Sequence, residues 1–218
     1  MNLAIVQIIK SILFAIVSAQ VIIKLSTYYL EGKKITKQES VILTLIVAIL
    51  SGLVFCYSDH LVEDLLVIVF LTIVGLIDYH TKTIVDGMMY IGAILLAILS
   101  ITKGVSIPAL LLGGAVGFVS YGSIYVLAKV IYKREAFGFG DVMFMGVIGI
   151  YLGVKLTLLA ALLTFYVAII WILVNKVLGS VLKREMEVAF APFMAISCII
   201  TMVFGDKIIQ LYMNLFMV

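Results

Sequence analysis

Residues 65–77 read LLVIVFLTIVGLI and are followed directly by Asp78. Only Thr72 and Gly75 interrupt this apolar run, and similar runs recur along the chain between short charged segments. A helix needs about 20 mostly apolar residues to cross the hydrocarbon layer of a bilayer. The pattern is therefore typical of a protein whose helices cross a membrane several times.

The composition supports the same class. Of the 218 residues, 65% are hydrophobic and 12% are charged, whereas a soluble domain is roughly 45–50% apolar and about 25% charged. So much apolar surface cannot be buried in one water-facing globule, which argues against a soluble enzyme, a disordered chain or a nucleic-acid-binding protein. Cys56 and Cys198 both lie in apolar runs and indicate neither a disulfide framework nor a metal site.

We predict an all-α, polytopic integral membrane bundle of about eight transmembrane helices. Residues 1–58 would hold two spans joined by a short basic loop, Lys24 to Glu39, and residues 59–218 would form a six-span core. An amphipathic piece at 208–218 could extend the last span. The expected spans cover residues 3–23, 40–58, 65–77, 87–101, 107–132, 141–152, 156–174 and 190–204.

The placement of lysine and arginine predicts the orientation. The loops after the first, third, fifth and seventh spans share one side, and that side carries eleven basic residues against three on the other. Basic residues are enriched in cytoplasmic loops, so we expect Asp78, Asp86 and Asp141 at the cytoplasmic face and both termini outside. The eleven are Lys24, Lys33, Lys34, Lys37, Lys82, Lys129, Lys133, Arg134, Lys176, Lys183 and Arg184; the three are Lys103, Lys155 and Lys207.

Most acidic residues are expected to be solvated loop charges, because they lie among other polar residues. Asp78, Asp86 and Asp141 are the exceptions, since Asp78 and Asp141 flank long apolar runs and ionisable groups near hydrocarbon are costly. The expected loop charges are Glu31, Glu39, Asp59, Glu63, Asp64, Glu135, Glu185, Glu187 and Asp206.

Asp78 and Asp141 could together hydrolyse a bond by acid–base chemistry. Two carboxylates that meet at a membrane edge can hold a single proton near neutral pH. The ionised member then takes a proton from water, while the protonated member donates a hydrogen bond to the scissile carbonyl. We therefore predict Asp78 and Asp141 as catalytic residues that work without a metal ion or other cofactor.

Three further residues are predicted to shape this site. Gly138 and Gly140 surround Phe139 just before Asp141, and glycine permits unusual backbone angles and close approach of another chain. A simple helix-entry turn with Asp141 as its cap would have a similar sequence. Asp86 could tune the aspartate pair, but the N-cap of the next span is its favoured role.

These motifs resemble those of a known family. Ile77-Asp78, Ile84-Val85-Asp86 and Gly138-Phe139-Gly140-Asp141 are similar to the two signatures of type IV prepilin peptidases, which are GxGD aspartyl proteases. The stretch from Ala189 to Phe193 is similar to the Pro-Phe segment that opens the last span of that family. The resemblance covers roughly residues 60–205 and implies that Asp78 and Asp141 are the catalytic pair.

The sequence departs from the family at two places. Val85 stands where the family usually has proline, and the loop from Lys24 to Glu39 contains no cysteine. Larger bacterial members carry an insertion with four cysteines after the first span and methylate the new N-terminus with S-adenosylmethionine. The resemblance therefore implies the peptidase activity and gives no support for the methyltransferase activity.

The resemblance also implies the partners. Substrates of this family are type IV prepilin-like proteins, with a basic leader in the cytoplasm and an apolar helix in the bilayer. We expect a multi-pass protein of the inner, cytoplasmic membrane that contacts lipid and these substrates, with its active site facing the cytoplasm. Nucleic acid is not an expected partner, and the sequence predicts no oligomeric state.

One alternative uses the same carboxylates in a small proton-coupled transporter. A transporter site usually lies near the middle of the membrane, between repeated halves of the chain. Asp78 and Asp141 instead flank the ends of spans, and the sequence contains no visible repeat. This arrangement favours the peptidase.

Overall fold

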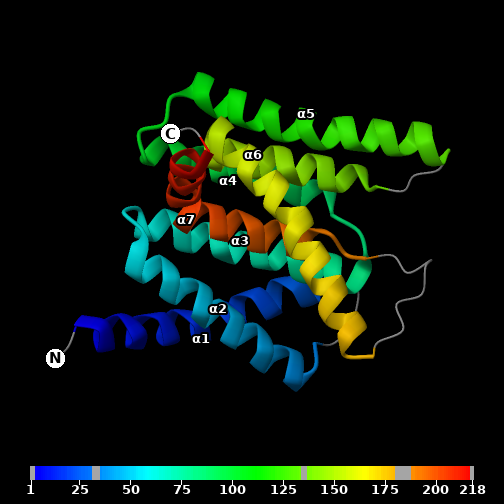
Figure 1. Ribbon diagram of the computed structural model, residues 1–218. Coiled ribbons are helices and arrows are strands. Elements are labelled where there is room, and N and C mark those ends of the chain that lie inside the picture. Colours follow the sequence, from blue (N-terminus) through cyan, green and yellow to red (C-terminus); the bar gives the residue numbers. More distant parts are fainter. Residues whose placement is uncertain (1–2, 31–34, 134–136, 180–187, 217–218) are drawn as a thin grey trace.

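A computed structural model describes residues 3–30, 35–133, 137–179 and 188–216, which form seven helices and no strand (Figure 1). Five helices, all except α3 and α4, are long and apolar enough to cross a membrane. The prediction of an all-α, polytopic membrane bundle is confirmed. The helices are α1 (Leu3–Tyr29), α2 (Lys37–Tyr57), α3 (Leu61–Thr81), α4 (Asp86–Thr102), α5 (Ile107–Tyr132), α6 (Phe139–Val177) and α7 (Ala191–Phe216).

The expected count of eight helices is not confirmed, because two expected spans are joined within α6. Gly153 interrupts this helix with φ 71° and ψ 174°, a combination that essentially only glycine adopts. Figure 1 shows the chain changing direction in the middle of α6. We call residues 139–152 the first section of α6 and residues 154–177 the second section.

Helix α3 lies at the centre of the bundle and packs against α1, α2, α4 and α7. Val67, Ile68 and Leu71 are completely buried. The helix begins earlier and ends later than the apolar run at 65–77, because its flanking polar residues are also helical. Asp64 therefore lies in its first turn and Asp78 in its last.

Helix α5 lies against the first section of α6 at backbone contact distance. A Cβ atom on Gly113 would lie 2.2 Å from the carbonyl oxygen of Gly149, and one on Gly117 would lie 2.2 Å from that of Met145. Glycines spaced four residues apart allow two helices to approach this closely. The packing holds the first section of α6, which carries Asp141 in its first turn, firmly in place.

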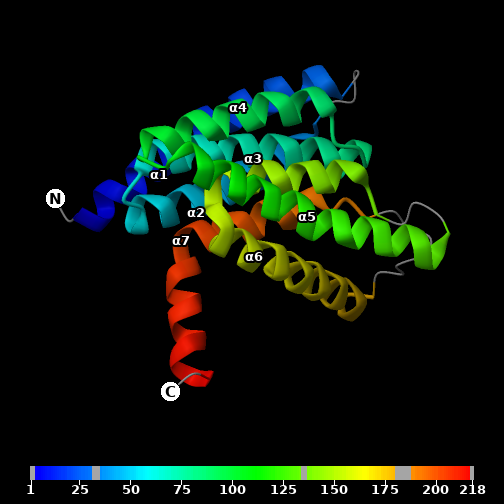
Figure 2. The same cartoon turned by 90° about the horizontal axis from the view of Figure 1, so that it is seen from above.

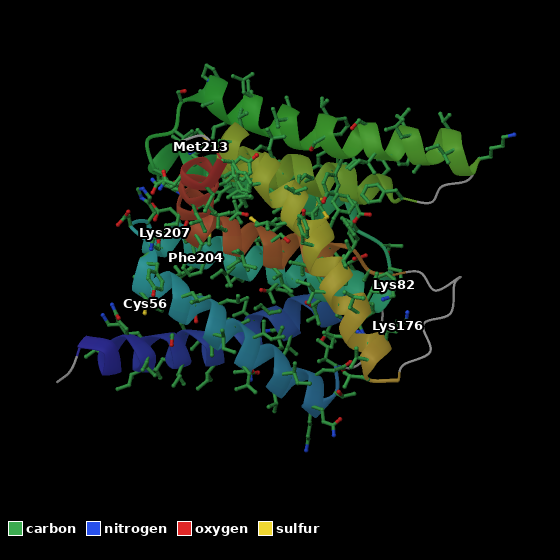
Figure 3. The ribbon with its side chains drawn as sticks, viewed as in Figure 1. Cys56, Lys82, Lys176, Phe204, Lys207 and Met213 are labelled. Atoms are coloured by element: carbon green, nitrogen blue, oxygen red, sulfur yellow. The ribbon has the colours of Figure 1, made fainter. Side chains whose placement is uncertain are left out.

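The two ends of the bundle differ in the residues they carry. Lys82 and Lys176 lie at one end, which we call the aspartate end, while Cys56, Phe204 and Lys207 lie at the opposite end (Figure 3). The last part of α7 leaves the bundle at that opposite end (Figure 2). Helix α7 includes the amphipathic piece from Ile208 onward and continues to Phe216.

The basic loop after the first span is shorter than expected, because α1 continues through Lys24 to Tyr29. Several charged residues used in the sequence analysis lie outside the described residues. These are Glu31, Lys33, Lys34, Arg134, Glu135, Lys183, Arg184, Glu185 and Glu187.

Asp64 is not the solvated loop charge that the sequence analysis expected. Its side chain is buried at the opposite end of the bundle and accepts hydrogen bonds from the hydroxyls of Ser58, at 2.6 Å, and Tyr151. Lys103 Nζ lies 3.7 Å from Asp64 Oδ1 and 4.2 Å from the centre of the Tyr151 ring. Buried carboxylates need such partners, and these partners join α3 to the first section of α6.

Replacing Tyr151 by phenylalanine tests this connection. The Tyr151→Phe variant leaves a buried Asp64 oxygen without one of its donors, so we expect a loss of about 1–3 kcal/mol in unfolding free energy. Denaturant titration of the purified protein in detergent measures this loss. Tyr166→Phe, an exposed position on the same helix, is the matched control and should change the stability little. Equal stability of the two variants would contradict a structural role for the Tyr151 hydroxyl.

The contact between α5 and α6 gives a second prediction. In Gly113→Ala the added methyl group meets the α6 backbone, and such overpacking costs about 1–3 kcal/mol. Gly122→Ala on the same helix is the control, because its nearest neighbour, a Val142 methyl carbon, is 3.7 Å away. Thermal unfolding in detergent should show a lower midpoint for Gly113→Ala only. An unchanged midpoint would mean that α5 and α6 can move apart without a loss of stability, which would contradict the prediction.

Candidate active site

Asp78 lies at the junction of α3 and α7. Its side chain is 4% exposed, and Oδ2 accepts a hydrogen bond of 2.9 Å from the backbone N–H of Ala191. The backbone of Phe190 also hydrogen-bonds this carboxylate. The first N–H groups of a helix lack partners within the helix and favour a negative charge. Asp78 therefore caps the start of α7 from a neighbouring helix.

Asp141 lies in the first turn of α6, where the backbone of Gly138 hydrogen-bonds its carboxylate. Gly138 occupies the N-cap position of this helix. An acidic side chain that reaches back to the N-cap backbone is a common way to begin a helix. The helix-entry role left open by the sequence is thus part of what Asp141 does.

The carboxylates of Asp78 and Asp141 also interact electrostatically with each other. They come from two helices that are separated in the sequence by α4 and α5. Each is held by backbone N–H groups near the start of a helix, Asp78 by α7 and Asp141 by α6. Two anchored acids facing one another can share a proton and exchange it with a water molecule.

The two glycines before Asp141 lie where side chains would not fit. A Cβ atom on Gly140 would lie 2.8 Å from Cβ of Ile84, and one on Gly138 would lie 3.0 Å from Asp141 Oδ2. The segment between α3 and α4 therefore packs closely over the start of α6. This close packing supports the predicted site-shaping role of both glycines, which stays a prediction.

Asp86 is an exposed residue at the start of α4. The prediction that it is the N-cap is wrong, because Val85 occupies that position and Asp86 is the first helical residue. The reason is that the helix begins one residue earlier than the sequence analysis assumed. An acid in the first turn still interacts favourably with the helix dipole. Its predicted role in shaping the site stays untested.

Tyr121 is a residue near the aspartates that the sequence analysis did not include among the site residues. It is completely buried, its hydroxyl donates to the carbonyl of Ala161 at 3.4 Å, and it interacts electrostatically with Asp141. Gly113, Gly117 and Tyr121 follow one another at four-residue spacing. Because such residues share one helix face, the glycine pair could have indicated that Tyr121 points toward α6.

Aromatic rings form a wall beside the two carboxylates. Phe190 lies 5.5 Å from Phe165 and 5.6 Å from Phe137, measured between ring centres, and Tyr121 lies 5.5 Å from Phe137. These residues come from α5, α6 and the segments just before α6 and α7. These rings make the surroundings of the carboxylates more apolar, and electrostatic interactions are stronger in apolar surroundings.

A metal centre would need several ligands in one place. Within the described part of the chain, no group of three or more His, Cys, Asp or Glu side chains is arranged to hold a metal ion.

Comparison with known proteins gives consistent relatives. The chain is 28% identical over 144 residues to a prepilin leader peptidase/N-methyltransferase of Pseudomonas putida, which covers 65% of this chain and 49% of that protein. It is 28% identical over 166 residues to a protein of the same name from Bacillus subtilis (strain 168), covering 76% of this chain and 64% of that protein. The chain is also 28% identical over 115 residues to a prepilin leader peptidase/N-methyltransferase of Stutzerimonas stutzeri, covering 50% of this chain and 37% of that protein.

The chain thus spans about half the length of the curated relatives that it matches. No solved structure matches it. The model of the type IV leader peptidase family matches residues 65–173, which is half of the chain and includes Asp78 and the stretch from Gly138 to Asp141. The resemblance seen in the sequence is confirmed, and the chain belongs to the type IV leader peptidase family.

Proposed function

We propose that this protein is a membrane aspartyl endopeptidase that removes the basic leader from type IV pilin-like precursors. Asp78 and Asp141 are the catalytic pair in this proposal. The observation that carries it is that two carboxylates from different helices, each anchored by backbone N–H groups, lie near enough to interact electrostatically. The segment that carries both acids is also the one that the family model matches.

The reaction needs only these two acids and water. The ionised carboxylate takes a proton from the attacking water, and the protonated one donates its proton to the oxygen of the scissile carbonyl. When the C–N bond of the resulting tetrahedral diol breaks, the leaving amine takes up a proton from the pair, and one hydroxyl of the diol returns its proton to the pair as the carboxylic acid forms. One proton then remains between the carboxylates, so the site is ready for another cycle.

The proposed site faces the cytoplasm of an inner, cytoplasmic membrane. Lys82 and Lys176 lie at the aspartate end of the bundle (Figure 3), in agreement with the enrichment of basic residues on the cytoplasmic side. A leader that stays in the cytoplasm then reaches the carboxylates without crossing the bilayer. Residues 59–218 form the peptidase core in this proposal.

The proposal does not extend to methylation of the new N-terminus. The names of the curated relatives include N-methyltransferase, but the chain spans only part of those proteins. The family match does not support the alternative interpretation as a proton-coupled transporter.

Replacing each aspartate by asparagine tests the catalytic pair. We expect Asp78→Asn and Asp141→Asn each to lower the cleavage rate by at least about a thousandfold, because neither amide can exchange the proton that the mechanism needs. In Asp78→Asn the new amide oxygen can still accept the N–H of Ala191, so the fold should persist. The assay mixes the enzyme and a pilin-like precursor in liposomes and follows the size of the precursor on a gel. Cleavage by the double variant would refute the proposal.

Replacing Asp86 by asparagine separates a helix-start role from a catalytic role. Asp86 is exposed, and its contribution to the helix dipole is small. We expect Asp86→Asn to retain activity within about tenfold of the wild-type rate, since its effect on the pair would be indirect. Complete loss of cleavage by a folded Asp86→Asn protein would make Asp86 a member of the catalytic site.

A further inference from the structure

An apolar groove runs along the bundle between α2, α3 and α7. Its volume is about 300 Å³, and its walls are almost entirely apolar. Helix α2 lines it from Glu39 to Leu50, which is about 16 Å of helix at 1.5 Å per residue. Such a length reaches roughly half-way through a hydrocarbon layer of about 30 Å. Ile42 and Ile46 line the groove and are exposed, so the groove opens on the outside of the bundle.

The groove passes directly beside the anchor of Asp78. Gly75 and Tyr79, which flank Asp78 on α3, both line it, and so does Pro192. Pro192 follows Ala191, whose N–H group holds the Asp78 carboxylate. A Cβ atom on Gly75 would lie 3.4 Å from Cα of Pro192. At this part of the groove α3 and α7 thus touch one another, next to the hydrogen bond that holds Asp78.

The end of the groove nearest to Asp78 is polar, unlike the rest. Glu39 and His80 line it there, with His80 Nε2 3.8 Å from Glu39 Oε1. His80 Nε2 is buried and has no hydrogen-bond partner among the described residues. A buried nitrogen without a partner costs free energy, and a bound peptide group could satisfy it. The Glu39 carboxylate adds a negative charge that favours a basic segment at this position.

We propose that this groove binds the apolar helix of the precursor, with the basic leader beside Glu39 and His80. The inference rests on the proposed function and specifies how the substrate is held. An apolar helix can bury a row of side chains three or four residues apart in a groove of this kind. A helix seated there would end beside Asp78, so the peptide bond just outside it could reach the two carboxylates.

A lipid chain is the other possible occupant of an apolar groove in a membrane. It could cover the walls formed by Ile46 and Ile196. An acyl chain, however, carries neither a positive charge for Glu39 nor a hydrogen-bonding group for His80 Nε2. The polar end beside Asp78 therefore favours a polypeptide that changes from basic to apolar along its length.

A bulky residue in the groove tests the proposal. Ile46→Trp fills the middle of the groove, while Leu45→Trp adds the same ring at the neighbouring α2 position, which is exposed and does not line it. We expect Ile46→Trp to raise KM for the full precursor about tenfold at unchanged kcat, which is the effect of lost substrate binding. Leu45→Trp should behave like the wild type. Unchanged kinetics of Ile46→Trp would overturn the proposal.

Crosslinking separates failure of the groove from failure of the proposed function. A photoreactive benzoylphenylalanine replaces Ile46 or Leu45 in an Asp141→Asn background, and the liposomes contain the precursor. Capture of the precursor at position 46 and not at 45 supports the groove, even if the wild-type enzyme proves unable to cleave. The other outcome is that the wild-type enzyme cleaves the precursor but position 46 captures only lipid. That result refutes binding of the precursor in the groove and leaves the peptidase proposal intact.

Discussion

The hydrogen bond between the Asp78 carboxylate and the N–H of Ala191 connects the parts of this protein that matter for its chemistry. A buried carboxylate is costly without partners, and the start of a helix has N–H groups without partners. One contact meets both needs and thereby fixes the position of α7 against α3. Phe190 of the aromatic wall and Pro192 of the groove lie on either side of Ala191, so both depend on this contact for their positions.

The helices that carry the two acids are joined at both ends of the bundle. At the aspartate end Asp78 and Asp141 interact, and at the opposite end Asp64 accepts a hydrogen bond from Tyr151. Between these points, α5 packs against the first section of α6 through glycine backbones. The break at Gly153 then lets the second section run in a different direction and contribute Phe165 to the aromatic wall. Two acids that would repel one another when ionised are thus held together by contacts distant from them.

The groove and the acids make a consistent arrangement for a substrate that is partly in the membrane. The groove is apolar over most of its length and polar only beside Asp78. A precursor with a basic leader and an apolar helix has the complementary order of properties. Within the type IV leader peptidase family, the part of the chain described here would then both bind the helix and cut next to it.

The sequence by itself determined the membrane class, the all-α fold and the two aspartates worth testing, because hydropathy and isolated carboxylates are local properties of the chain. The four-residue spacing of Gly113 and Gly117 is also a local property of the chain, and it is typical of a helix that packs closely against another. Only the tertiary structure decided that Asp78 and Asp141 lie near enough to interact electrostatically, that Asp64 is buried, and that Val85 rather than Asp86 caps α4. The groove likewise forms from three helices distant in the sequence. These features depend on which helices become neighbours and where each helix begins, and both are set by contacts between residues far apart in the chain.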